Sequence, residues 1–113
     1  MRIAEVSKIS KLSTDTLRYY EKIGILGPIA KNSNGIRDYS NQDLNIIKFI
    51  KCMKATGLSI EDIKHYLELS KEGDHTKEER KEMLMNQRRI LLEKVDELEA
   101  TLKYIDVKIE GYE

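Results

Sequence analysis

The stretch that decides the fold is TDTLRYYE, residues 14–21, which is followed shortly by Gly24. Ser13 immediately precedes it and is a good N-cap, because a serine hydroxyl accepts hydrogen bonds from the free amides of a first helical turn. Asp15 adds negative charge to that turn, where the helix dipole favours it. We therefore predict a helix over residues 14 to about 23, ended by the glycine.

A shorter amphipathic helix is predicted just before this one. Ile3, Val6 and Ile9 are spaced to share one helical face, and the small residues of segment 10–13 form a tight connection. Two helices joined by a short turn form the arrangement in which the second helix enters the major groove of DNA. Such pairs are also ordinary packing units, so this pattern alone leaves both interpretations open.

Residues 26–39 are predicted to form a small β-hairpin. A polar cluster at 32–35 separates two segments with the length of short strands, 29–31 and 36–39. The Asn-Gly pair at 34–35 tolerates the positive φ angles that a tight hairpin turn requires. Because an isolated two-stranded hairpin is unstable, it must pack against the helices as a wing.

Two further helices are predicted to close the core. The first is capped by Ser40 or Asn41 and runs to about Thr56, before Gly57. Its buried face is expected to hold Ile46, Phe49, Ile50 and Met53. The second covers residues 60–70 after a Ser59 cap, and its buried face is expected to hold Ile63, Tyr66 and Leu67. Residues 71–75 are expected to form a loop.

Residues 76–112 are predicted to form one long helix, opened by a capping box of Thr76 and Glu79. Its apolar positions alternate by four and three and are interrupted only by Arg88; they are Leu84, Leu91, Val95, Leu98, Leu102, Ile105, Ile109 and Tyr112. Such a seam is typical of a left-handed coiled coil. At about 1.5 Å per residue the helix spans roughly 55 Å, so we expect the same helix of a second chain to cover it.

Composition and charge narrow the classes of function. Residues 1–57 carry ten basic and five acidic side chains, whereas residues 58–113 carry ten and fifteen, so only the N-terminal half attracts a polyanion. Neither a membrane-spanning run nor a signal sequence is recognisable, and we expect a cytoplasmic protein that does not bind membranes. The single cysteine, Cys52, excludes an internal disulfide and a cysteine-rich metal site. No cofactor is expected.

The TLRYYE motif at 16–21, the R-x-Y motif at 37–39 and the long C-terminal helix occur in an order that resembles the MerR family of bacterial regulators. The resemblance covers the whole chain. It implies an all-α fold with a small β-hairpin wing, in which a winged helix-turn-helix over residues 1–71 precedes a long antiparallel coiled-coil dimerisation helix over residues 76–113. It also implies a homodimer that binds a palindromic promoter operator in double-stranded DNA. Such members activate transcription by distorting the promoter spacer for RNA polymerase.

Seven residues are candidate DNA contacts under this resemblance: Thr14, Thr16, Arg18, Tyr19, Tyr20, Arg37 and Tyr39. The two arginines suit phosphate, because a guanidinium offers several donors in a fixed geometry. The two threonines lie where base edges are within reach. One of the adjacent tyrosines is expected to be a core residue. Glu21 is expected to pair locally with an arginine or lysine.

Cys52 is the candidate sensor. Its position resembles the single cysteine of NmlR-like and AdhR-like members, which respond to aldehydes and other electrophiles. Lys48 lies one helical turn earlier, where a cation favours the reactive thiolate form. The alternative role is a small residue that fills a packing gap. Residues 73–76, where metal-responsive members carry a cysteine, contain none here, so metal sensing is disfavoured.

The sequence disfavours one other class of function and leaves a second one open. A cysteine-dependent enzyme is disfavoured, because no residue near Cys52 in the sequence supplies a base. A coiled-coil protein-protein interaction module with a helix-turn-helix body remains the alternative. It would lack the steep salt dependence that DNA binding through phosphates produces.

Overall fold

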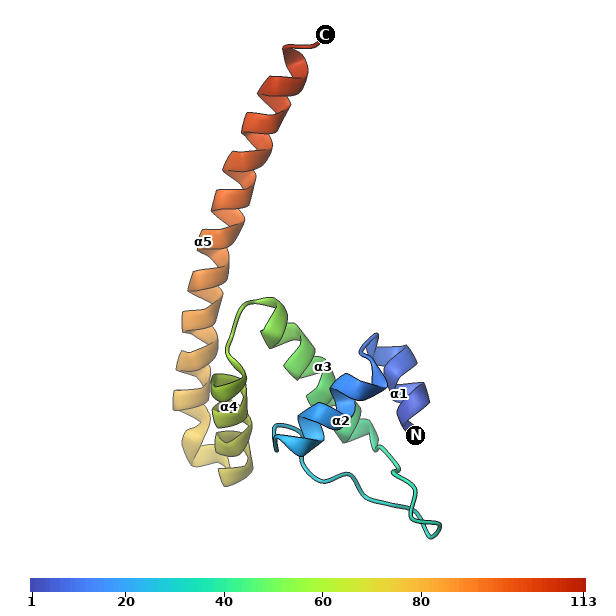
Figure 1. Ribbon diagram of the computed structural model, residues 1–113. Helices are drawn as coiled ribbons and strands as arrows, with labels where there is room; N and C mark the ends of the chain where they lie inside the picture. Colours follow the sequence, from blue (N-terminus) through green and yellow to red (C-terminus); the bar gives the residue numbers. More distant parts are fainter. The chain divides into compact units, whose positions relative to one another are not determined.

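The computed structural model describes residues 1–113, the whole chain, and is helical throughout apart from its loops (Figure 1). The elements in order are α1 (Ile3–Ser10), α2 (Thr14–Lys22), α3 (Asn41–Ala55), α4 (Ile60–Glu72), the short 3-10 helix η1 (Asp74–Thr76) and α5 (Lys77–Glu110). The chain divides into two compact units, Met1–Lys71 and Glu72–Glu113. Each unit is described by itself.

The first unit is built around one apolar core, to which α1 to α4 and the segment between α2 and α3 all contribute. Its buried members are Val6, Leu17, Tyr20, Ile25, Leu26, Ile29, Tyr39, Leu44, Ile47, Ile50 and Ile63. Burying one large aliphatic side chain stabilises a fold by about 1.5–3 kcal/mol. This core therefore holds the helix-turn-helix and the wing together as one body.

Two lysine side chains donate hydrogen bonds to backbone oxygens at the carboxyl ends of α1 and α2. The Nζ of Lys51 on α3 donates to the backbone oxygen of Ser10 at 2.7 Å. The Nζ of Lys64 on α4 donates to the backbone oxygen of Ile23 at 3.4 Å. Cations favour this end of a helix, where backbone carbonyls lack partners and the dipole is negative.

The cap of α3 is as predicted, but its buried row of residues differs from the prediction. Ser40 Oγ accepts from the Asp43 amide at 3.0 Å, and Asp43 Oδ2 accepts from the Ser40 amide at 2.9 Å, which forms a capping box. The fully buried residues of α3 are Leu44, Ile47 and Ile50, whereas Ile46, Phe49 and Met53 of the expected stripe are half-buried. The cause is packing on more than one side: α1 contacts α3, and Phe49 stacks on Tyr66 of α4 with ring centroids 4.8 Å apart.

The expected β-hairpin is not formed as two strands. Residues 29–39 double back on themselves, but the only pairing is an isolated antiparallel bridge between Lys31 and Arg37. The turn is organised by Asn32, whose side-chain oxygen accepts from the amides of Asn34 and Ile36. Only Gly35 of the expected Asn-Gly pair has a positive φ, of 74°. A short two-stranded ribbon with its tip in solvent has too few cross-strand contacts to extend the ladder, which explains the difference. We call residues 29–39 the wing from here on.

The second unit consists of η1 and the long helix α5. The capping box predicted at Thr76 is wrong: Thr76 makes no side-chain cap hydrogen bond to α5. Its hydroxyl instead donates to the Gly73 carbonyl at 2.8 Å and accepts from Arg80 Nε at 3.0 Å. The extra 3-10 turn before α5 places Thr76 in a turn conformation, φ −92° and ψ 0°, so its hydroxyl points back along the chain.

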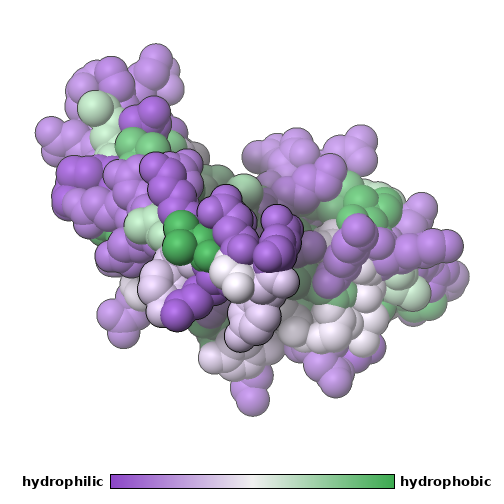
Figure 2. Space-filling view, turned by 90° about the horizontal axis from the view of Figure 1, so that it is seen from above, coloured by the Kyte–Doolittle hydropathy of each residue, from purple (hydrophilic) through white to green (hydrophobic).

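The face seen in the space-filling view is largely hydrophilic, with hydrophobic residues visible between hydrophilic ones (Figure 2). No helix is both long and apolar enough to cross a membrane, since even the 34-residue α5 is interspersed with charges. No cluster of three or more histidine, cysteine or acidic side chains has the geometry to hold a metal ion.

Candidate nucleic-acid interface

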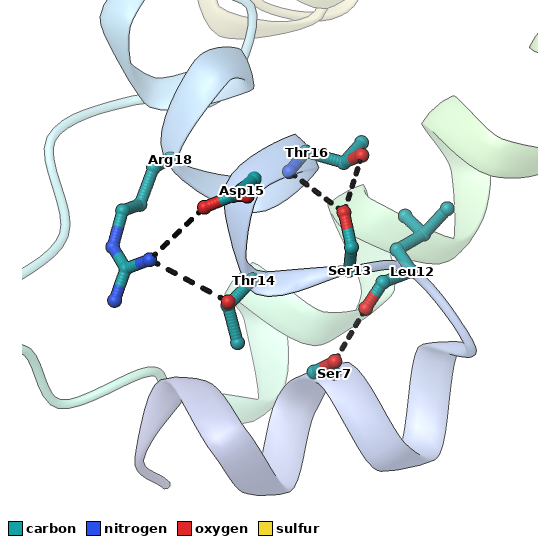
Figure 3. Close-up of polar contacts among 7 residues, drawn as sticks. All are labelled: Ser7, Leu12, Ser13, Thr14, Asp15, Thr16 and Arg18. Carbon is teal, nitrogen blue, oxygen red and sulfur yellow. Dashed lines mark hydrogen bonds and ion pairs between the residues drawn. The ribbon is translucent and has the colours of Figure 1, made fainter.

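The turn between α1 and α2 is held by short-range hydrogen bonds (Figure 3). Lys11 ends α1 in the left-handed region at φ 60°, and its amide donates to the Ser7 carbonyl at 2.9 Å. The Ser7 hydroxyl donates to the Leu12 carbonyl at 2.5 Å. Ser13 Oγ then accepts from the Thr16 amide at 3.1 Å, which confirms the predicted N-cap of α2. These bonds fix the direction in which α2 leaves the turn.

The first turns of α2 present a polar, partly exposed row of side chains (Figure 3). Thr14 and Thr16 are half-buried, and half of the Arg18 side chain is exposed, 52%. Its Nη1 lies 3.5 Å from Thr14 Oγ1 and 3.4 Å from Asp15 Oδ1. Exposed ion pairs of this length contribute little stability, so a stronger acceptor such as a phosphate can displace them at small cost.

The adjacent tyrosines of α2 divide between surface and core. Tyr19 is 50% exposed, whereas Tyr20 is 6% exposed and belongs to the core. Burial raises the pKa of the Tyr20 hydroxyl above its ordinary value, and the neighbouring Tyr19 adds to the shift. The prediction that one of the two is a core residue is therefore confirmed. The prediction that Tyr20 contacts DNA at the surface is wrong, because the helix turns its ring into the core.

The wing supplies a second guanidinium, and an ion pair joins it to α2. Arg37 Nε donates to Glu21 Oε1 at 2.8 Å, with the two side chains 38% and 19% exposed respectively. Glu21 was expected to pair with a nearby arginine or lysine, and its partner is sixteen residues away along the chain. A local pattern in the sequence does not indicate such a pair, since only the return of the wing brings the two side chains together.

Tyr39, at the base of the wing, is buried and does not offer its ring to the surface. Its side chain is 2% exposed, and its hydroxyl oxygen has no hydrogen-bond partner. Burial raises the pKa of Tyr39, the negative charge of Glu21 raises it further, and Arg37 and Arg18 oppose the shift. Its expected role as a surface contact is corrected: the residue fills the core between the wing and the helices.

The amino terminus holds the base of the wing from another side. The Met1 ammonium donates to Asp38 Oδ1 and to the Tyr39 carbonyl, each at 2.8 Å. The Tyr39 amide donates to the Met1 carbonyl at 2.7 Å. The sequence did not predict these hydrogen bonds, because no motif indicates a contact between the first residue and a segment far along the chain.

Cys52 and Lys48, the candidate sensor pair, both lie on α3 and both are exposed. They line a shallow groove together with residues from the end of α1; its lining includes Ile9, Ser10, Lys11, Lys48, Lys51 and Cys52. The groove is mainly apolar in its walls, with lysines around it. The thiol is thus open to a small reagent from solvent.

The apolar seam of α5 lies open in the single chain. Leu84 is half-buried, and the other predicted seam residues are exposed: Leu91, Val95, Leu98, Leu102, Ile105 and Ile109. Leu98 reaches 66% exposure. A row of large apolar side chains at this exposure is unfavourable in water unless a partner covers it.

Two family models match the chain. One, described as the MerR HTH family regulatory protein, matches residues 1–70, and another, described as MerR, DNA binding, matches residues 44–106. The chain belongs to the MerR family. Its fold is accordingly a predominantly helical MerR-type helix-turn-helix followed by a long C-terminal helix.

Individual MerR relatives agree with this assignment. The HTH-type transcriptional regulator AdhR of Bacillus subtilis (strain 168) is 47% identical over 93 residues, which are 82% of this chain and 66% of AdhR, just under two thirds of that relative. The solved structure of HiNmlR, described as a MerR family regulator that lacks the sensor domain and is bound to promoter DNA, is 32% identical with a TM-score of 0.87; the match covers 98% of this chain and 88% of HiNmlR.

A third relative is a MerR family transcriptional regulator from Bacillus thuringiensis, with 32% identity, a TM-score of 0.87, and coverage of 98% of this chain and 97% of that one. AdhR and HiNmlR support the expected resemblance to AdhR-like and NmlR-like members. All three relatives are described as regulators and none as an enzyme.

Proposed function

We propose that this protein is a DNA-binding transcriptional regulator that grips a promoter through α2 and the wing. The observation that carries the proposal is that α2 and the wing, joined by the ion pair of Arg37 with Glu21, each carry an arginine with a partly exposed side chain, Arg18 on α2 and Arg37 on the wing. Arginine is the side chain best suited to bind phosphate. Thr14 and Thr16 would then face base edges beside Arg18 and Tyr19, while Tyr20 and Tyr39 support the surface from the core.

Residues 1–71 would form the DNA-binding domain, and residues 76–113 would form an antiparallel coiled coil with the same helix of a second chain. The open seam of α5 supports this division, because it needs a partner of matching length. A symmetric homodimer presents two recognition helices to the two half-sites of a palindrome.

Activation would follow from deformation of the bound promoter. A dimer that bends and untwists an over-long spacer brings both promoter elements into the alignment that RNA polymerase reads. Deforming a site in this way costs on the order of 1–6 kcal/mol, which contacts to phosphate must offset. Two arginines on each of two protomers place the required positive charge on the DNA backbone.

The test of DNA binding is Arg18→Ala, measured by fluorescence anisotropy against a random-sequence duplex and a duplex enriched from a random library by repeated selection with this protein. Because phosphate contacts are independent of sequence, we expect weaker binding to both duplexes and a salt slope smaller by about 1.8, which is about 0.9 for each of the two protomers. Arg89→Ala, at an arginine of α5 whose side chain is also exposed, is the matched control for lost charge. A loss confined to the enriched duplex would contradict the phosphate role.

The same salt titration separates DNA binding from the alternative of a coiled-coil interaction module. The exposed seam of α5 is compatible with either function. A protein-interaction module shows little affinity for DNA and no steep dependence on salt.

Cys52, with Lys48 beside it, is the proposed input for aldehyde or electrophile stress. The exposure of the thiol in a groove between α1 and α3 supports this proposal. Modification of the thiol must favour one DNA-bound conformation over another in order to change transcription. Helix α3 is suited to that role, because it is packed against α1 and carries the core residues behind the wing.

The test of the sensor is Cys52→Ser, with transcription from a promoter that carries the selected operator measured before and after addition of formaldehyde or methylglyoxal. We expect the variant to bind the operator normally and to lose induction. Lys48→Gln should induce at higher electrophile concentration, since it removes the neighbouring cation. Normal induction of Cys52→Ser would rule the sensor out.

A further inference from the structure

The ion pair between Glu21 and Arg37 leaves most of the guanidinium unoccupied. Arg37 donates through Nε to Glu21 Oε1 at 2.8 Å, and it donates no hydrogen bond through its terminal nitrogens Nη1 and Nη2. A guanidinium carries five N–H donors, so four remain available on the two terminal nitrogens. These donors have the fork geometry that binds two oxygens of one phosphate.

The two side chains of this pair differ in exposure. Glu21 lies in the last turns of α2, and its side chain is only 19% exposed. Arg37 projects from the wing and keeps 38% of its side chain exposed. The carboxylate is therefore the fixed member, and it restrains an arginine that would otherwise sample many rotamers.

The backbone at Arg37 is restrained as well. The following residues, Asp38 and Tyr39, are held by the amino terminus at 2.8 Å. The Lys31–Arg37 bridge holds Arg37 to the opposite arm of the wing. With the backbone and Nε both fixed, only the terminal nitrogens of Arg37 remain free to engage a ligand.

We propose that Glu21 is a positioning residue for DNA binding: it holds Nε of Arg37 so that the Nη edge is oriented for one backbone phosphate. This inference rests on the proposed function, in which Arg37 contacts DNA. Preorganisation removes part of the entropy that binding otherwise costs. The carboxylate also carries a cost, because its negative charge lies near the phosphate that Arg37 binds.

Two variants distinguish the favourable positioning of Arg37 by Glu21 from the unfavourable negative charge of Glu21 near the phosphate. Glu21→Gln keeps an oxygen that accepts from Nε and removes the negative charge, so we expect affinity equal to or greater than that of the wild type. Glu21→Ala removes the acceptor in both protomers, and we expect affinity to fall about four- to a hundredfold, because immobilising one flexible side chain is worth about two- to tenfold. Glu68→Ala, an exposed carboxylate on α4, controls for the change in net charge.

The experiment is a double-mutant cycle on the full chain with Glu21→Ala, Arg37→Ala and the combined variant, using anisotropy on the selected duplex across a range of salt concentrations. Arg37→Ala should weaken binding and lower the salt slope by about 1.8, which is about 0.9 for each of the two protomers. The effect of Glu21→Ala should disappear in the Arg37→Ala background, because a positioning residue acts only through the residue it positions. Urea denaturation of each variant reports any loss of stability separately.

The remaining outcomes overturn the inference in different ways. If Glu21→Ala weakens binding equally in both backgrounds, Glu21 acts on the fold and not on Arg37. If Glu21→Ala tightens binding beyond the Glu68→Ala control, the carboxylate competes with DNA for the guanidinium. If Arg37→Ala has no effect while Arg18→Ala weakens binding, the wing contact fails and α2 alone binds DNA. If neither arginine variant weakens binding, the proposed function itself fails.

Discussion

At the scale of single residues, the buried Tyr39 hydroxyl has the clearest effect on the free energy of unfolding. It is buried without a hydrogen-bond partner, and leaving such a group unpaired costs about 1–3 kcal/mol. We expect Tyr39→Phe to raise the free energy of unfolding by about 1 kcal/mol in urea denaturation, and to leave DNA affinity unchanged. Tyr19→Phe, at an exposed ring, should leave the free energy of unfolding unchanged. A clear loss of stability in Tyr39→Phe would show that the hydroxyl does have a partner.

Asp38 links the wing to acid stability. The hydrogen bond from the Met1 ammonium lowers the pKa of Asp38 most, and the ammonium charge lowers it further. A carboxyl with a lowered pKa in the folded state contributes stability above its unfolded value, about 3.9, and loses it as pH falls through the lowered pKa.

We therefore expect wild-type protein to lose more stability than Asp38→Asn as pH falls below about 5, measured by urea denaturation at each pH. Extending the chain before Met1 should have the same effect as the substitution, because it removes the ammonium. Parallel pH profiles for wild type and variant would show that the pair does not contribute.

At the scale of elements, α3 depends on its reciprocal cap. The Ser40 and Asp43 side chains each accept a hydrogen bond from a backbone amide at the start of this helix. The helix carries three core residues. Removing an N-cap serine costs about 1 kcal/mol. Ser40→Ala should lower the free energy of unfolding by about this amount, while Ser33→Ala, at the exposed tip of the wing, should have no effect. Equal stability of the two variants would contradict the role of the cap.

At the scale of the whole molecule, we expect the exposed seam of α5 to decide the oligomeric state. A lysine at Leu98, 66% exposed in the single chain, would be buried at the centre of the proposed coiled coil in both protomers. Each protomer then loses about 1.5 kcal/mol of apolar burial, so we expect dimerisation to weaken about a hundredfold in Leu98→Lys. Ala100→Lys, on the opposite side of the heptad, is the control. Sedimentation equilibrium that finds Leu98→Lys as dimeric as wild type would exclude this interface.

The sequence by itself determined the features that depend on neighbouring residues. Helix ends follow from local capping groups, and so the Ser13 and Ser40 caps and the start of α2 were predicted correctly. The repeat of α5 is likewise a local property, because its period appears along a single helix. The family resemblance rests on short contiguous motifs and was confirmed by the family models.

Tertiary structure alone decided which face of each element is covered. Periodicity groups residues on one face, but segments distant in sequence determine whether that face is buried. Tyr20 is buried whereas its neighbour Tyr19 is exposed, and Ile47 is fully buried on α3 although it lies outside the predicted stripe. The same reason applies to the wing, where Tyr39 is buried and Arg37 meets Glu21. These contacts join segments that only the folded chain brings together. A local sequence pattern does not contain the burial and ion-pair energies that favour them, because both partners must first be close in space.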